Sequence, residues 1–192
     1  MTQRRAAAVA GHEEDEGAAR MLAADPDPGT RAAALGALAR MGRLGDDDLA
    51  GALADGAATV RVRGAELAAH RPGVVLLGAL DDLDPAVVEA AAWASGERRP
   101  AEPGAVGALV RVARHHEDPL CREASVAALG SIGDPDGLPA VLAATGDKPA
   151  VRRRAVLALA PFEGPEVEAA LQRALTDRDW QVRQAAEDLL DP

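Results

Sequence analysis

One motif recurs along the chain at a nearly constant interval. Each copy places an arginine, or in one case a valine, at the same point, and the six positions are Arg31, Arg61, Val88, Arg122, Arg152 and Arg183. Their spacings are 30, 27, 34, 30 and 31 residues. A period near 30 residues is typical of chains that stack small structural repeats into a solenoid. This periodicity limits the possible folds more than any other feature.

Each copy reads as two helices. In the fifth copy, Asp147 and Pro149 open the first helix, because aspartate caps free N–H groups and proline is tolerated in a first turn. Apolar residues then follow at helical spacing, and a second, shorter helix follows after a loop. Glycine readily takes the left-handed conformation that ends a helix. We therefore expect first helices to end at four glycines, which are Gly42, Gly96, Gly130 and Gly164.

The composition favours helices over strands. Hydrophobic residues make up 48% of the chain and about half of them are alanine, the best helix former. Aromatic residues make up only 2%, and no stretch alternates between apolar and polar residues. We predict an all-α, right-handed solenoid of about six short helix pairs. We expect residues 13–192 to form a single domain that begins with a lone second helix at 13–24. Residues 1–12 precede it as an N-terminal segment that can be flexible.

The repeated motif resembles a known family. The fifth copy reads Pro149-Ala150-Val151-Arg152 with Ala155, Ala158 and Leu159, and residues 118–142 match the full pattern best. This pattern resembles the short HEAT-like repeats of phycocyanobilin lyase (PBS lyase) subunits, over roughly residues 20–190. The resemblance implies an α-solenoid of HEAT-like helix pairs. It also implies a function class, since arrays of this family mostly bind proteins, while a minority are enzymes or hold chromophores.

Charge and composition argue against several kinds of partner. The formal net charge is −10, whereas nucleic-acid-binding proteins usually show a basic face and often aromatic stacking platforms. One cysteine allows no internal disulfide and no cysteine metal cluster. No run of 18 apolar residues exists, and the first residues make a poor signal peptide. We expect a cytoplasmic protein that binds neither nucleic acid nor membrane, and the oligomeric state is left open.

The arginine column has two interpretations. A row of arginines could bind phosphates or carboxylates of a ligand. Alternatively, the arginines pair with aspartates of neighbouring copies in an internal ladder, since Asp25, Asp55 and Asp177 lie six residues before three of them. We favour the ladder, because the repetition follows the period of the scaffold.

Catalytic and metal-binding signals are weak. Cys121 lies in an otherwise apolar column and is expected in the core. The family includes an iron-dependent hydroxylase with His-Glu pairs just after the arginine column, but no histidine follows Arg122 or Arg152 in this way. His115 and His116 lie at a predicted helix end, where positive charge is favoured. We expect no catalytic residue, no cofactor and no bound metal.

The third copy is irregular. It has Val88 in place of arginine, a tryptophan, a long loop over residues 96–104 and a basic second helix. Tryptophan and arginine are enriched where proteins bind partners, so we predict partner-binding residues here. They are Trp93, Arg98, Arg99, Arg111 and Arg114. For Trp93 itself we favour a second interpretation, in which it fills a gap in the core where Val88 cannot.

The leading functional interpretation is a non-enzymatic scaffold. It would bind a protein or peptide on a concave face lined by the second helices, including those expected in residues 70–82 and 137–147. The alternative is an enzyme, or a subunit that handles a chromophore or small molecule, with its site near the third copy. A deep pocket with converging polar groups favours the enzyme, and an open groove favours the scaffold.

Overall fold

The computed structural model describes residues 3–12 and 15–190. In this described part all regular elements are helical, with twelve α-helices and two short 3₁₀ helices, which confirms the predicted all-α class. None of the described helices is long and apolar enough to cross a membrane. The chain divides into two compact bodies, an N-terminal body (Met1–Ala91) and a C-terminal body (Ala92–Pro192), and each is described by itself.

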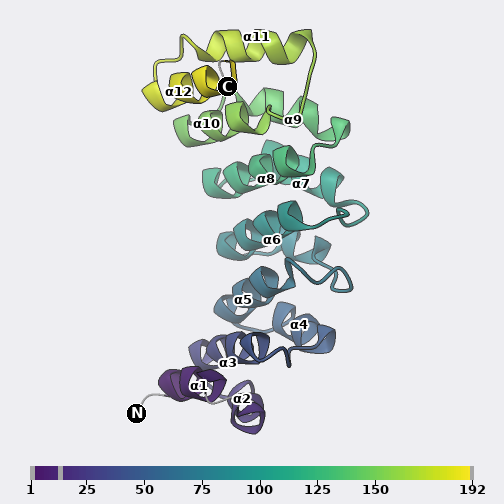
Figure 1. The fold of residues 1–192 in the computed structure, drawn as a ribbon, viewed down its shortest axis with the longest axis vertical. Helices are drawn as coiled ribbons and strands as arrows, with labels where there is room; N and C mark the ends of the chain where they lie inside the picture. Colours follow the sequence, from purple (N-terminus) through teal and green to yellow (C-terminus); the bar gives the residue numbers. More distant parts are fainter. Residues whose placement is uncertain (1–2, 13–14, 191–192) are drawn as a thin grey trace. The chain divides into compact units, whose positions relative to one another are not determined.

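First and second helices alternate along the chain (Figure 1). The first helices are α1 (Gln3–His12), α3 (Pro28–Arg40), α5 (Ala58–Ala68), α6 (Pro85–Glu97), α8 (Pro119–Ile132), α10 (Pro149–Ala158) and α12 (Trp180–Leu190). The second helices are α2 (Glu16–Leu22), α4 (Asp46–Leu53), α7 (Ala105–His115), α9 (Leu138–Ala144) and α11 (Pro165–Ala174). The 3₁₀ helix η1 (Leu77–Asp81) stands in for one second helix, and η2 (Pro135–Gly137) precedes α9.

Within each body, first helices pack against first helices. In the N-terminal body α1, α3 and α5 contact one another in succession, with α2 on α1 and α3 and with α4 on α5. In the C-terminal body α8, α10 and α12 contact in succession, while α7, α9 and α11 pack against them. Each body is therefore two layers of helices, one row of first helices and one row of second helices. This is the predicted α-solenoid arrangement.

The described residues contain one first helix more than the sequence pattern indicates. Helix α1 precedes α2 and packs on α3, as α3 packs on α5. The prediction that α2 is a lone second helix was therefore wrong. Arg4 of α1 donates from Nε to Asp27, the residue that caps α3 through the N–H of Thr30. The domain boundary at residue 12 stays a prediction.

Two of the four glycines serve packing and do not end helices. Gly96 and Gly130 lie inside α6 and α8. A Cβ atom added to Gly96 would lie 2.8 Å from the Cα of Ala128, and one added to Gly130 would lie 2.6 Å from the Cα of Ala158. Only glycine allows such close approach of successive first helices. Gly42, just after α3, and Gly133, the C-cap of α8, have the left-handed conformation. Gly164 also has a positive φ, but it is the N-cap of α11 and does not end α10, so that expectation was wrong.

The second helix expected in residues 70–82 is only the 3₁₀ helix η1. Pro72 and Gly73 begin this segment, and Val74 and Val75 follow. Proline and glycine interrupt a helix, and β-branched valines lose side-chain freedom in one. Too few residues then remain before Asp82 for a regular α-helix.

The arginine column forms a ladder. In each of its four rungs a guanidinium group holds the carboxylate of the following repeat through Nε and Nη2, at 2.7–2.9 Å. The rungs are Arg31–Asp55, Arg61–Asp82, Arg122–Asp147 and Arg152–Asp177. Their side chains keep only 7–20% of their exposure. The interpretation of the column as an internal ladder is confirmed.

Each rung also fixes the backbone on both sides. The third guanidinium nitrogen donates to a carbonyl five or six residues earlier, as Arg152 Nη1 does to the Asp147 oxygen at 2.9 Å. The carboxylate accepts an N–H from the turn before its own first helix, as Asp177 does from Asp179 at 2.8 Å. A rung therefore joins one first helix to the turn that opens the next.

The ladder changes at both partners in the third repeat. Val88 is fully buried at the arginine position. Six residues before Arg122, where the repeats of Arg31, Arg61 and Arg183 have aspartate, stands His116. Its Nδ1 accepts the N–H of Asp118 at 3.1 Å, which is the backbone contact that the ladder aspartates make. The histidine thus keeps the turn in place without an arginine.

We predict that Arg152→Ala lowers the free energy of unfolding by roughly 1–3 kcal/mol, because Asp177 is left desolvated and unpaired. Urea unfolding measures this change. The matched control is Arg183→Ala, since Arg183 donates to the Asp177 carbonyl but forms no rung with a described residue. We expect the control to cost about 1 kcal/mol or less. Equal losses in the two variants would contradict the role assigned to the rung.

The ladder also predicts acid sensitivity. The hydrogen bond from its arginine partner outweighs desolvation and lowers the pKa of Asp55, Asp82, Asp147 and Asp177. A carboxyl group whose pKa is lower in the folded than in the unfolded protein stabilises the fold at pH values above its unfolded pKa, which is about 3.9 for aspartate. This stabilisation is lost as the pH falls through the lower, folded-state pKa. Urea midpoints should therefore fall steeply below about pH 4.

Asp177→Asn should flatten this pH dependence, because one linked carboxyl is removed. Asp136→Asn, which alters an exposed carboxyl outside the ladder, is the control and should keep the wild-type slope. A slope that is the same in all three proteins would show that the ladder does not couple folding to protons.

We predict that Ser125→Ala stabilises the protein by about 1 kcal/mol. The Ser125 hydroxyl is fully buried and has no hydrogen-bond partner, which costs desolvation without return. Four other repeats have alanine at this position, namely Ala34, Ala91, Ala155 and Ala186. The control is Ser131→Ala, which should destabilise, because Ser131 Oγ donates to the Gly96 carbonyl at 2.8 Å. Thermal unfolding distinguishes the two signs.

Candidate functional site

Two of the five predicted partner-binding residues hold the long loop of the third repeat. Arg98 is only 3% exposed and donates from Nη1 to Glu102 Oε2 at 2.9 Å. Burial lowers the pKa of Arg98, because it disfavours the charged form. Arg99 donates from Nη2 to the carbonyl and hydroxyl of Ser131 at 2.7 and 2.9 Å, and from Nη1 to the Gly96 carbonyl. These guanidinium groups tie the loop to the ends of α6 and α8.

Trp93 lies at the surface. It is 47% exposed, and on α6 it shares one exposed stripe with Glu89 and Glu97, four residues to either side. Its neighbours Ala92 and Ala94 are fully buried on the opposite side of the helix. The interpretation in which Trp93 fills the core is therefore wrong, and its ring belongs to the outward face of the first-helix row.

Arg111 and Arg114 lie in the other layer. Both are exposed on α7, and Arg114 Nη2 reaches the Pro139 carbonyl in the first turn of α9 at 3.4 Å. The opposite side of α7, with Leu109 and Val112, is buried. The five predicted residues thus divide into a loop pair, a tryptophan on a first helix and two arginines on a second helix.

A further exposed aromatic residue was missed as a site. Trp180 is 64% exposed at the first position of α12. The other repeats have small or proline residues there, which suit helix initiation, namely Pro28, Ala58, Pro85, Pro119 and Pro149. A tryptophan in this column has no role in starting the helix, and that contrast was the signal available in the sequence.

Trp180 borders a groove of about 240 Å³ between α10 and α12. Arg153 and Leu157 of α10 line one wall, and Gln184, Ala185 and Asp188 of α12 line the other. Gln184 Nε2 donates to Asp188 Oδ1 at 2.8 Å, which fixes the polar end of that wall. The groove offers an apolar floor, an aromatic edge and one cationic side chain.

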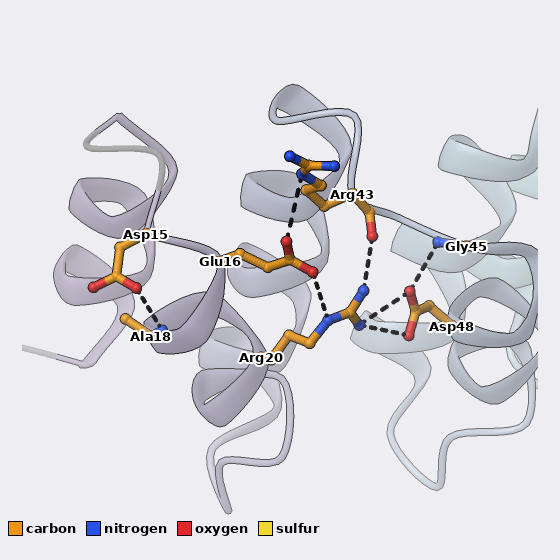
Figure 2. A network of polar contacts seen from close by, with 7 residues as sticks. All are labelled: Asp15, Glu16, Ala18, Arg20, Arg43, Gly45 and Asp48. Atoms are coloured by element: carbon orange, nitrogen blue, oxygen red, sulfur yellow. Dashed lines mark hydrogen bonds and ion pairs between the residues drawn. The ribbon is translucent and has the colours of Figure 1, made fainter.

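The N-terminal body contains a polar network between its second helices (Figure 2). Arg20 of α2 donates to Glu16 at 3.1 Å, to both carboxylate oxygens of Asp48 at 3.1 and 3.3 Å, and to the Arg43 carbonyl at 2.9 Å. Asp48 in turn accepts the N–H of Gly45 at the start of α4. The hydrogen bond with Glu16 contributes most to raising the pKa of Arg20. This network links α2 to α4 as the ladder links first helices.

An acidic pocket lies beside this network. It measures about 300 Å³, and its lining includes Asp47, Asp48 and the rung Arg31–Asp55 over the side chain of Leu35. Acids of the segment 46–48 thus border a partly apolar hollow. The charge of the pocket suits cations more than anions.

The described residues contain no candidate metal-binding cluster. No group of three or more His, Cys, Asp or Glu side chains there is placed to hold a metal ion. Cys121 is fully buried, as expected from its column. Neither pocket has a described histidine, cysteine or serine in its lining.

Comparisons with known proteins identify the repeats. The family model for HEAT repeats matches residues 74–160, and the model for the PBS lyase HEAT-like repeat matches residues 151–177. No curated protein matches the chain in sequence.

Several solved structures share the fold. The YibA protein of Escherichia coli has 18% identity and a TM-score of 0.70, over 98% of this chain and 75% of that one. A designed armadillo repeat protein in complex with the peptide (KR)4 has 18% identity and a TM-score of 0.63, over 98% and 97%. Human deoxyhypusine hydroxylase in complex with glycerol has 21% identity and a TM-score of 0.51, over 98% and 78%.

At these identities the likeness to solved structures concerns the fold alone. The family models fall on the repeats that the arginine column defines, and the second of them covers the fifth repeat with its rung Arg152–Asp177. Two helical layers, a 30-residue period and these matches lead to one conclusion. The chain contains HEAT-like repeats, one of which matches the PBS lyase repeat type.

Proposed function

We propose that this protein is a non-enzymatic interaction scaffold that binds a protein or peptide. The observation that carries the proposal is the exposure of both tryptophans in a chain with only 2% aromatic residues. A buried large side chain contributes roughly 1.5–3 kcal/mol, so exposed rings at Trp93 and Trp180 forgo stability. Tryptophan is the residue type most enriched at binding hot spots.

The fold supports the same proposal. A designed armadillo repeat protein of similar fold is solved in complex with a peptide, so stacked helices of this kind can present a peptide-binding surface. Repeat arrays offer extended surfaces on which successive helices contact successive parts of a partner. Both pockets are lined by aspartate and arginine side chains together with apolar groups. Protein-binding surfaces combine polar and apolar groups in the same way.

Two surfaces of the third repeat would contact the partner. On the first-helix row, Trp93 supplies a large flat contact at low entropy cost. Arg111 and Arg114 lie on the second-helix row, which the sequence pattern assigns to a concave face. Their charged groups would orient the partner by pairing with its carboxylates. Arg98 and Arg99 act by holding the loop that connects α6 to α7.

Affinity capture from native lysate tests this function. We expect wild-type protein to retain a specific polypeptide, and the Trp93→Ala bait to lose most of it. Because Trp93 is half exposed, this variant should keep the wild-type melting temperature. Retention of no polypeptide by either bait would overturn the scaffold proposal.

Fluorescence checks whether Trp93 itself meets the partner. In a Trp180→Phe background the only remaining tryptophan is Trp93. Its emission should be red-shifted and readily quenched by acrylamide, and the captured partner should shift it to the blue and protect it. Blue, protected emission in the free protein, unchanged by the partner, would place the contact elsewhere.

A further inference from the structure

We propose that the first-helix row of the C-terminal body docks one segment of the partner, which spans from Trp93 to Trp180. This segment carries an apolar anchor at each end and an acidic side chain between them, opposite Arg153. The inference rests on the proposed function, since it assumes that the chain binds a protein or peptide.

The two tryptophans belong to one stripe of the first helices. Trp180 stands three residues before the arginine position of its helix, and Trp93 stands five residues after it. Positions three before, one after and five after are four residues apart and share one helix face. In α12 these are Trp180, Gln184 and Asp188, all exposed, and all three line the groove. The stripe therefore faces outward.

The same stripe on the intervening helices supplies a floor. At the position of Trp93, helix α8 has Ala127 and α10 has Leu157, both partly buried. Leu157 lines the groove together with Ala185. A partner crossing these helices meets Ala127 and Leu157 between two aromatic ends, with the charged side chains of Glu123 and Arg153 beside them on the same stripe.

The span sets the length of the segment. Gly96 of α6 packs against Ala128 of α8, and α8, α10 and α12 follow in contact. Neighbouring helices pack about 8–10 Å apart, so three intervals amount to roughly 24–30 Å. The eight-position offset between the two tryptophans adds about 12 Å along the helix axes, which brings their separation to roughly 27–32 Å. An extended chain covers about 3.3 Å per residue, so the anchors are separated by roughly eight to ten residues.

The charge of α10 selects an acidic partner at the middle. Helix α10 has three arginines in succession, of which Arg152 is in the ladder and Arg154 lies 3.6 Å from Glu123. Arg153 lines the groove and pairs with no carboxylate among the described residues. An acidic side chain there gains a charge-assisted hydrogen bond, whereas a lysine or arginine would meet repulsion.

Selection from a phage-displayed library of random 16-residue peptides on the immobilised full chain tests the inference. We expect enriched peptides to share two apolar residues about eight to ten positions apart with an acid between them. Trp180→Ala, Trp93→Ala and Arg153→Glu should each weaken binding of the synthetic peptides at least about tenfold. A peptide with lysine in place of its acid should recover affinity for Arg153→Glu.

The matched control is Arg173→Glu, which makes the same charge change on an exposed residue of α11, in the second-helix row. It should alter affinity less than about twofold. Thermal unfolding confirms that each variant is folded, and Trp180→Phe, which keeps an aromatic ring, should lose less affinity than Trp180→Ala.

Three outcomes overturn the inference. Enriched peptides that tolerate Trp180→Ala and Arg153→Glu but are lost with Arg111→Glu or Arg114→Glu place the site on the second-helix row, and the scaffold proposal then survives. Enrichment of basic peptides contradicts the charge argument. If the library yields no binding peptide, the inferred docking segment is ruled out. The lysate capture tests the scaffold proposal independently.

Discussion

The bidentate pair between an arginine of one repeat and an aspartate of the next is the interaction on which the other features depend. The aspartate accepts the guanidinium and an N–H of its own turn, so one carboxylate fixes both the neighbour and the start of a helix. Partly buried ion pairs contribute little net stability but are costly to break on one side. In an alanine-rich core, whose small side chains bury little area each, the rung gives register to helices that could otherwise slide.

The third repeat lacks this pair, and several other features change with it. Both partners differ there, with Val88 for arginine and His116 for aspartate, and the boundary between the two compact bodies falls three residues after Val88. The same repeat has the exposed Trp93 and the loop held by Arg98 and Arg99. Departures from local rules concentrate where a protein has a function to perform.

Periodicity predicted the helical layers and the ladder, because a column of arginines preceded by aspartates has few other uses. It could not predict contacts that depend on the neighbouring helix. A glycine that ends a helix and a glycine that admits Ala128 or Ala158 look alike in sequence. Helix α1 was missed because Gln3 begins it without the Asp-Pro signal. The burial of Arg98 depends on a loop path that no periodic pattern encodes.

The two tryptophans show how a site can vary while the scaffold stays fixed. Successive residues of a helix point about 100° apart, so the ladder position and the outward stripe are independent although they are adjacent in sequence. Helix α10 illustrates this within three residues, since Arg152 enters a rung, Arg153 lines the groove and Arg154 faces Glu123. Substitution on the stripe leaves the rungs intact. Selection can therefore place Trp93 or Trp180 where other repeats have leucine, alanine or proline without loss of register.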